Sequence, residues 1–303
     1  MRWPYSWRKK EGCPLKIPHL AGLIYRWDCF VENLYIKSAR LPKMGIYQGE
    51  ERKEKVVVSL TTFPARINAC YYAIKSLMIQ TYKADRIVLW LAESQFEKNG
   101  LPNEYQGLIQ RGLEVRYCED LRSHKKYFYA LQEQKEGELV ITFDDDIIFE
   151  KDAIEKLVQM HRKYPNCLIC NRGHHITSSN KKLSPYNEWK ICSPEGVGTP
   201  SMKILPSTGA GCLYPYGIMP ETTFNIELIK KNAYTADDIW MCFNRTIAEI
   251  PAVKTREKNA ILCNVKHSQK EALTVINDLG EGNQKTIECL LELFPRAITF
   301  WVE

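Results

Sequence analysis

Three consecutive aspartates interrupt an apolar stretch near the middle of this 303-residue chain. The stretch is ITFDDDIIFE (141–150), so Asp144, Asp145 and Asp146 stand between two apolar runs. Unpaired carboxylates next to a core are costly, and a buried strand does not normally end in three of them. A capping or calcium-type surface cluster would also contain acids, but the apolar flanks on both sides favour a functional acidic site at a strand end.

The composition is that of an ordinary globular protein, with 45% hydrophobic and 26% charged residues. Neither a secretory signal nor an apolar run of the roughly 18 residues needed to cross a bilayer is visible, which predicts a cytoplasmic protein. The eleven cysteines are scattered and odd in number, as expected in a reducing compartment. Cys167 and Cys170 form a lone CxxC, and on a strand they would point to opposite faces and could not share a metal.

The basic charge is concentrated at the N-terminus. Residues 1–50 carry nine basic and four acidic side chains, which is a net charge of +5, with aromatic residues interleaved. This pattern suits the surface of an anionic membrane, and it suits equally well an extension that packs on the body of the protein. A nucleic-acid partner is not expected, because the remainder of the chain is nearly neutral and carries no nucleic-acid motif.

Strands and helices are predicted to alternate from residue 56 onwards. Apolar runs predict strands at 56–60, 86–91, 113–117, 139–143 and 167–170, with helices at 66–80, from a Ser123 cap to 131, and at 152–164. After residue 170 the pattern becomes irregular, with a strand or turn within 206–215 and helices from about 235 and over 286–293. This order predicts an α/β fold with a mostly parallel sheet covered on both faces.

Polar residues follow several of these strands directly. Thr61, Thr62, Asp120 and the three aspartates all come just after strand ends. Ligands of open α/β sheets bind beyond the carboxyl ends of the strands, so these side chains are expected to converge on one crevice. Carboxylates there can hold Mg²⁺ or Mn²⁺, which commonly bridges protein acids to substrate phosphates.

A second acidic pair, Asp237 and Asp238, lies almost a hundred residues later at a predicted helix start. One carboxylate could act as a base that removes a proton from an acceptor hydroxyl. Acids are also simply favoured at helix N-termini, so the pair alone is weak support for catalysis.

Six stretches in this order resemble the bacterial GT-A glycosyltransferases associated with capsular and lipopolysaccharide sugars. They are SLTTFPARI (59–67), DLRSHKKYFYAL (120–131), ITFDDDII (141–148), CNRGH (170–174), STGAGCLYP (207–215) and TADDIWM (235–241). The resemblance spans roughly 56–284. It implies a Rossmann-like GT-A domain over 56–303, with a nucleotide-sugar half (56–170) and an irregular acceptor half (171–303), preceded by an N-terminal extension (1–55).

The resemblance also implies residue roles. Asp146 would be the direct ligand of Mn²⁺ or Mg²⁺ and Asp144 a second ligand or a ribose contact, while Asp145 completes the nucleotide-sugar motif. Asp238 matches the base of inverting enzymes, with Asp237 as its neighbour. The nucleotide pocket would further contain Thr61, Thr62, Arg66, Asp120, Lys125 and Lys126.

Five more residues are candidates on the acceptor side or at the metal. Gly209 and Gly211 would let the backbone approach donor sugar and acceptor, and Arg172 would bind a phosphate or a sugar carboxylate. Trp240 would stack on a sugar face or pack in the core. His267 is the only late histidine and is a candidate additional metal ligand.

The expected activity is transfer of a sugar from a nucleotide sugar, most plausibly a UDP-sugar, to a glycan or lipid-linked acceptor in surface polysaccharide biosynthesis. Such an enzyme would work in the cytoplasm or peripherally on the cytoplasmic face of the inner membrane. Two alternatives stay open: a haloacid-dehalogenase-like phosphatase that uses Asp144 and Asp146, and a non-catalytic sugar-nucleotide-binding protein.

Overall fold

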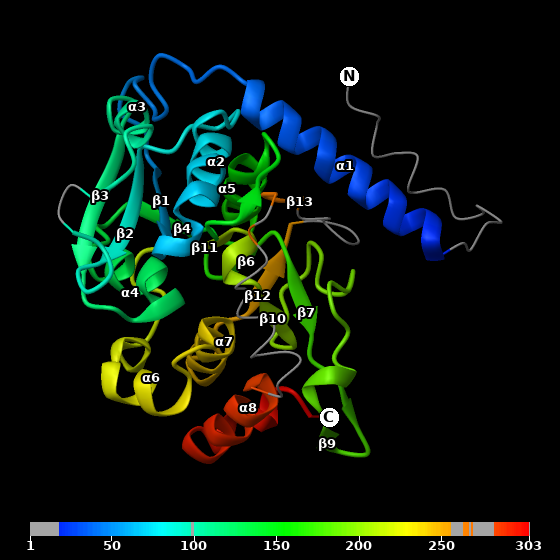
Figure 1. Cartoon of the computed structure of the whole chain (residues 1–303). Coiled ribbons are helices and arrows are strands. Elements are labelled where there is room, and N and C mark those ends of the chain that lie inside the picture. The colour runs from blue at the N-terminus through cyan, green and yellow to red at the C-terminus, as the bar shows by residue number, and fades with distance from the viewer. Residues whose placement is uncertain (1–17, 98–99, 256–262, 267, 269–281, 303) are drawn as a thin grey trace.

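A seven-stranded sheet forms the centre of the molecule (Figure 1). The computed structural model describes residues 18–97, 100–255, 263–266, 268 and 282–302. The strand order is β12-β6-β11-β4-β1-β2-β3, and every pairing is parallel except those of β11, which runs antiparallel to β4 and β6. The strands are β1 (Lys55–Thr61), β2 (Arg86–Ala92), β3 (Leu113–Cys118), β4 (Glu138–Thr142), β6 (Leu168–Cys170), β11 (Cys212–Tyr214) and β12 (Ala252–Lys254).

Smaller strands and the helices complete the fold. Three two-stranded sheets pair β10 (Ile204–Pro206) with β7 (Gly173–His175), β13 (Cys263–Asn264) with β5 (Ile147–Ile148), and β8 (Ser178–Ser179) with β9 (Lys182–Leu183). The α-helices are α1 (Pro18–Ser38), α2 (Ile67–Met78), α3 (Tyr105–Ile109), α4 (Lys125–Gln132), α5 (Ala153–Lys163), α6 (Ile226–Asn232), α7 (Asp237–Ile247) and α8 (Gly282–Leu293). Short 3₁₀ helices include Pro64–Arg66, Arg122–His124, Thr208–Ala210 and Pro295–Phe300.

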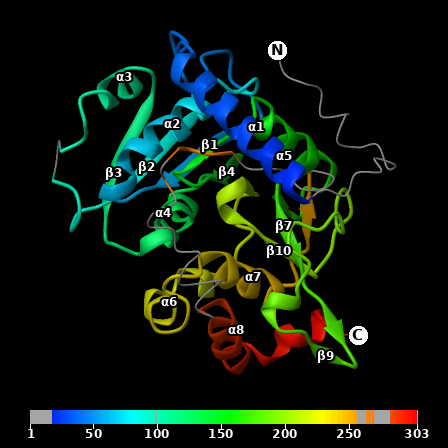
Figure 2. The same ribbon diagram turned by 45° about the vertical axis from the view of Figure 1, so that its right-hand side comes forward.

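Apolar side chains on both faces of the sheet explain why its strands are continuous hydrophobic runs. In β1, Val56, Val58 and Leu60 pack in a core with residues of α2 and α5, whereas Val57 packs in a second core with residues of α4 and α7. Figures 1 and 2 show these helix pairs on opposite sides of the sheet. A strand covered on both faces has no polar side to alternate with, as in parallel sheets generally.

The expected first half of the fold is confirmed, since the five strands predicted up to residue 170 match β1, β2, β3, β4 and β6 with ends shifted by at most one residue. The predicted Ser123 cap is wrong, because a 3₁₀ helix at 122–124 leads into α4 without a side-chain capping bond. The irregular region after residue 170 also contains β11, which inserts between β4 and β6. A three-residue strand is too short to show a readable period.

The cysteines behave as predicted. Cys167 and Cys170 belong to the two different cores on either side of the sheet, so they face apart. Every cysteine in the described part of the chain is a free thiol.

Helix α1 lies along the outside of the domain and contacts α2, β5 and β13 (Figure 1). Its Asn33 is buried and forms hydrogen bonds with the end of β13 and the residues that follow it. Asn33 Nδ2 donates to Asn264 O at 3.0 Å, and Asn33 Oδ1 accepts from Lys266 N at 2.9 Å. The next amide in that segment, Val265 N, donates to the carbonyl of Asp146 at 2.7 Å. No helix among the described residues is both long and apolar enough to cross a bilayer.

Replacing Asn33 by alanine should loosen this segment. The Asn33→Ala variant removes two side-chain hydrogen bonds to backbone groups, at about 0.5–1.5 kcal/mol each, so the free energy of unfolding should fall by about 1–3 kcal/mol. Amide hydrogen exchange at Val265 and Lys266 should accelerate. The control is Asn232→Ala, which removes the hydrogen bond from the Asn232 side chain to Leu228 O at the end of α6. It should leave exchange at these two amides unchanged.

Candidate functional site

The carboxyl ends of β1 and β4 open into a cleft of about 650 Å³. Twelve of the predicted site residues line it: Thr61, Thr62, Arg66, Asp120, Lys125, Lys126, Asp144, Asp145, Asp146, Arg172, Asp237 and Asp238. They come from segments up to 177 residues apart in sequence, Thr61 to Asp238. The expected convergence of strand-end residues on one crevice is therefore what the structure shows.

Two of the three aspartates, Asp145 and Asp146, share Arg66 as a partner, and Asp144 has a different one. Asp145 is buried, accepts a hydrogen bond from Thr62 Oγ1 at 2.5 Å and pairs with Arg66 at 3.1 Å. Burial raises the pKa of Asp145 to about 7, with the charges of the adjacent aspartates acting in the same direction and Arg66 opposing them. Arg66 also reaches Asp146 Oδ2 at 3.1 Å, so one guanidinium holds two neighbouring carboxylates.

Asp144 turns instead toward α4. Its Oδ1 accepts from Lys126 Nζ at 2.6 Å, and its side chain is 40% exposed to the cleft. Gly209 makes this position accessible, because a Cβ there would lie 1.7 Å from Asp144 Oδ2. The backbone of Gly209 also accepts a bond from Asp144 N at 2.9 Å.

Lys126 joins the two acidic clusters that the sequence separates. Its ammonium, on a side chain only 3% exposed, is 2.6 Å from Asp144 and 3.0 Å from Asp237. Burial lowers the pKa of a lysine, but the two carboxylates outweigh burial and raise the pKa of Lys126 above its ordinary value. The lysine is thus charged, and it ties the loop after β4 to the start of α7.

Thr208 holds the second acidic pair. Its hydroxyl oxygen lies 2.8 Å from Asp237 Oδ2 and 2.5 Å from Asp238 Oδ1, so its single proton is shared between the two acids, and its amide donates to Asp238 Oδ1 at 2.9 Å. Burial alone would raise the pKa of Asp237, but Lys126 and its other partners outweigh burial and hold that pKa well below its usual range. Burial and the charge of Asp237 raise the pKa of Asp238 to about 7. The two adjacent acids therefore have shifted pKa values in opposite directions, which is the arrangement that acid–base sites use.

A third corner of the cleft is centred on Asp120, after β3. Its carboxylate accepts bonds from Lys125 Nζ at 2.5 Å, Gln95 Nε2 at 2.9 Å and Arg122 N at 2.9 Å. Burial pushes its pKa up, but the bonds from Lys125 and Arg122 prevail and keep the pKa below its usual value. An ionised acid with an amide and a lysine beside it presents both acceptors and donors to a polar ligand.

One residue predicted on the acceptor side, Trp240, lies in the core instead. Trp240 is fully buried, donates to Thr223 O at 2.9 Å and packs near Phe294, so stacking on a sugar is wrong and core packing is its role. The prediction that Gly209 and Gly211 let the backbone approach a sugar stays a prediction, and the structure shows what lies beside each glycine. The space in front of Gly209 is filled by Asp144, and a Cβ at Gly211 (φ +104°) would lie 2.6 Å from Asn171 and 2.8 Å from Phe143. His267 lies outside the described residues.

Several residues of the cleft were not singled out from the sequence. The lining residues among them include Gln95, Arg122, Ser207, Tyr186, Tyr234 and Asn283, and Thr208 is buried directly behind the cleft, where it contacts Asp237 and Asp238. Gln95 follows the end of β2, so its strand-end position could have identified it. Thr208 carried no such signal, since its role depends on the position of β11 in the sheet.

The donor set fits a hard divalent cation bound jointly with a substrate. No group of three or more His, Cys, Asp or Glu side chains within the described ranges is arranged to hold a metal by itself. Mg²⁺ sites at phosphates commonly use only one or two carboxylates and complete their coordination with phosphate oxygens and water. Asp144 and Asp146 both line the cleft and supply that type of ligand.

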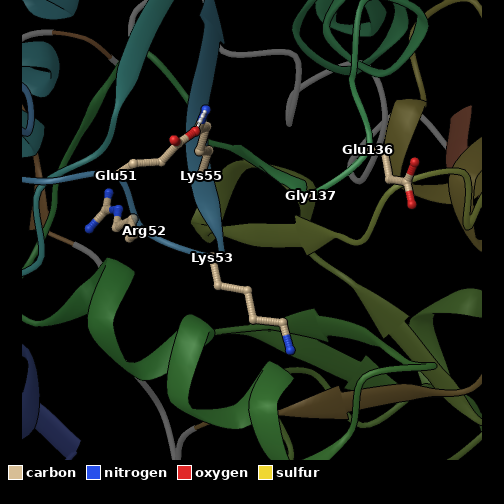
Figure 3. Close-up of a pocket in the computed structure, with 6 residues that line it drawn as sticks. All are labelled: Glu51, Arg52, Lys53, Lys55, Glu136 and Gly137. Carbon is tan, nitrogen blue, oxygen red and sulfur yellow. Dashed lines mark hydrogen bonds and ion pairs between the residues drawn. The ribbon is translucent and has the colours of Figure 1, made fainter.

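A second hollow of about 400 Å³ lies at the opposite end of the sheet, at the start of β1 and β4 (Figure 3). It is open and lined by charged side chains, of which Lys55 and Glu51 pair at 2.8 Å while remaining 47% and 81% exposed. Ligands of open α/β sheets bind beyond the carboxyl ends of the strands. This hollow is therefore separate from the candidate site.

Comparison with solved structures defines the fold. The chain superposes on a mannosyltransferase, PcManGT from Pyrobaculum calidifontis in complex with GDP-Man and Mn²⁺, with a TM-score of 0.50, 12% identity, and coverage of 88% of this chain and 74% of that one. It matches 4-diphosphocytidyl-2C-methyl-D-erythritol synthase from Anaerococcus prevotii less well, with a TM-score of 0.41, 11% identity, and coverage of 76% and 97%. No protein-family model and no curated protein sequence gives a significant match. The fold is GT-A-like, as predicted, and at such low identities the likeness is one of fold alone.

Removing the Lys126 charge should destabilise the protein strongly. In Lys126→Met, Asp144 and Asp237 lose their shared cation, and breaking a buried pair by removing one partner should cost roughly 3 kcal/mol in the free energy of unfolding. Denaturant unfolding measures this loss. Lys230→Met, which breaks the exposed pair with Glu119, is the matched control and should have little effect. Equal stability of the two variants would contradict the bridging role.

Proposed function

We propose that this chain is a metal-dependent glycosyltransferase that moves a sugar from a nucleotide-sugar donor to an acceptor hydroxyl. The observation that carries the proposal is the single cleft in which Lys126 connects the acids after β4 with the acids that begin α7. One acidic cluster suits a cation and a diphosphate, and the other suits proton removal. The GT-A-like fold, shared with a mannosyltransferase solved with GDP-Man and Mn²⁺, supports the same assignment.

On the donor side, Asp146 and Asp144 would hold Mn²⁺ or Mg²⁺. The cation, when bound, neutralises the diphosphate and stabilises it as a leaving group. Arg66, Lys125 and Lys126 line the same part of the cleft and add positive charge around the acids. Asp120, with Gln95 beside it, would contact the ribose or the base, and a UDP-sugar is the donor that we favour.

On the acceptor side, Asp238 would take the proton of the attacking hydroxyl. The Thr208 amide and hydroxyl both contact Oδ1 of Asp238, so we assign the proton taken from the acceptor to Oδ2. As the acceptor oxygen bonds to the anomeric carbon on the face opposite the diphosphate, the bond to the diphosphate breaks and the configuration inverts. Asp237 acts indirectly, by fixing Lys126 and Thr208. Arg172 would bind an anionic group of donor or acceptor, and the acceptor would be a glycan or a lipid-linked oligosaccharide of surface polysaccharide synthesis.

The phosphatase alternative has less support. In such a phosphatase, the strand that ends in Asp144 would be the first strand of the domain. The strands and helices before it would then belong to an unrelated N-terminal part. In the structure β1 is the direct partner of β4, and β2 and β3 extend the same sheet. Asp144 is also paired with a buried lysine, which weakens it as a free nucleophile.

The donor-side roles predict the behaviour of Asp146→Ala. This variant should lose both turnover and metal-dependent nucleotide binding, because one carboxylate serves the cation that both require. Isothermal titration with UDP, GDP and CMP, with and without Mn²⁺, measures the binding, and a screen of nucleotide sugars for metal-dependent hydrolysis measures the turnover. Glu119→Ala, an exposed acid outside the cleft, is the control. Full activity in Asp146→Ala, or release of phosphate from simple phosphate esters by the wild type, would refute the assignment.

The acceptor-side role predicts a different variant and a pH profile. Asp238→Asn should keep metal-dependent nucleotide binding and lose at least about a hundredfold in kcat, the usual contribution of a general base. The base works only when deprotonated, and its pKa is raised to about 7. In the wild type kcat/KM should therefore rise with pH through about 7 and then level off. Loss of nucleotide binding in Asp238→Asn would argue against its role as base.

A further inference from the structure

Helix α1 exposes an apolar face to the outside of the molecule. Trp27 is 64% exposed, Leu34 53% and Phe30 51%, with Val31 and Tyr35 beside them. Half of the strongly exposed large apolar side chains in the described part of the chain lie on this one helix, and the others are scattered. Single exposed apolar residues need no explanation, but a contiguous group of five indicates an interaction surface.

The spacing shows that this surface is a second face of the helix. Positions 27, 30, 31, 34 and 35 follow the 3.6-residue period, so they form one stripe, which we call the outer stripe. Another stripe, Cys29, Asn33 and Ile36, is turned to the body, where Ile36 is buried beside Cys263 and Val265. Helix α1 lies on the outside of the domain (Figure 2), fixed to the body by one side and with the outer stripe exposed on the other.

The charges around the outer stripe are mainly positive. Arg26, Lys37 and Arg40 are exposed, and Lys151 Nζ lies 5.1 Å from the ring of Tyr35. The two acids of the helix, Asp28 and Glu32, are half-buried. In the sequence, the seventeen residues before α1 add five basic side chains and one acidic side chain.

We propose that the outer stripe of α1 docks on an anionic phospholipid bilayer, with the helix lying in the plane of the headgroups. Tryptophan, tyrosine and phenylalanine on one face of a helix with basic flanks suit the boundary between headgroups and acyl chains. Anionic headgroups also neutralise the exposed arginines and lysine. A second copy of the chain would instead bring two basic rims together, so charge complementarity favours the bilayer.

Co-sedimentation of the full chain with vesicles tests this proposal. The wild type should bind vesicles of equal parts phosphatidylcholine and phosphatidylglycerol, bind phosphatidylcholine vesicles much more weakly, and release with rising salt. The triple variant Trp27→Gln/Phe30→Gln/Leu34→Gln should lose at least about tenfold in vesicle affinity, because the inserted apolar area is removed. Its thermal unfolding should match that of the wild type, since the exchanged side chains are exposed. Ile191→Gln/Tyr216→Gln, which changes two exposed apolar residues elsewhere, should bind like the wild type.

Three outcomes would overturn the proposal. Wild-type protein that binds neither kind of vesicle has no membrane face. Equal binding by the triple variant places any membrane contact elsewhere on the chain. A concentration-dependent dimer in sedimentation velocity that the triple variant abolishes, without vesicle binding, assigns the stripe to a second copy. Vesicle binding needs no donor, metal or turnover, so its failure would leave the proposed chemistry untouched.

Discussion

The charge of one buried lysine holds the site together. Lys126 reaches Asp144 from the loop after β4 and Asp237 from the start of α7, and these two acids are 93 residues apart in sequence. Six aspartates line this half-enclosed cleft, and like charges so close together cannot all remain ionised without cations between them. The difference between the pKa values of Asp237 and Asp238 depends on the same charge. Asp237 is kept ionised next to Lys126, whereas the pKa of Asp238 is about 7. Arg66 has the equivalent position between Asp145 and Asp146.

The sequence predicted the fold best where burial of both strand faces requires a continuous run of apolar residues. The strands up to β6 could be located because both of their faces are covered, which leaves uninterrupted apolar runs. The strand-end rule then placed Thr62, Asp120 and the aspartates at one edge of the sheet. What could not be read was the direction of each side chain. Lys125 and Lys126 are adjacent, yet one pairs with Asp120 and the other with Asp144, because successive residues of a helix point about 100° apart.

The position of β11 in the sheet could not be predicted from the sequence either. The strand β11 has three residues, and only its place between β4 and β6 brings Thr208 and Gly209 against the acidic groups. The glycines of the 207–215 stretch were expected to make room for a ligand, and in the structure they also make room for Asp144, Asn171 and Phe143. The same requirement for close approach explains both readings, so sequence alone cannot distinguish a glycine that admits substrate from one that admits the protein's own side chains. Trp240 illustrates a similar ambiguity, and burial resolves it in favour of the core.

The connection between α1 and the acidic loop has a thermodynamic consequence. Asn33 clasps Asn264 and Lys266, and the amide between them is bonded to the carbonyl of Asp146. Three hydrogen bonds thus connect the helix on the outside of the domain with the backbone of an acid in the cleft. Coupling of this kind is reciprocal: if occupation of the cleft orders the Asp146 loop, it also steadies α1, and a contact that steadies α1 favours occupation of the cleft by the same factor. Under that condition, the hydrogen bonds of Asn33 would link the outer helix thermodynamically to the candidate cleft.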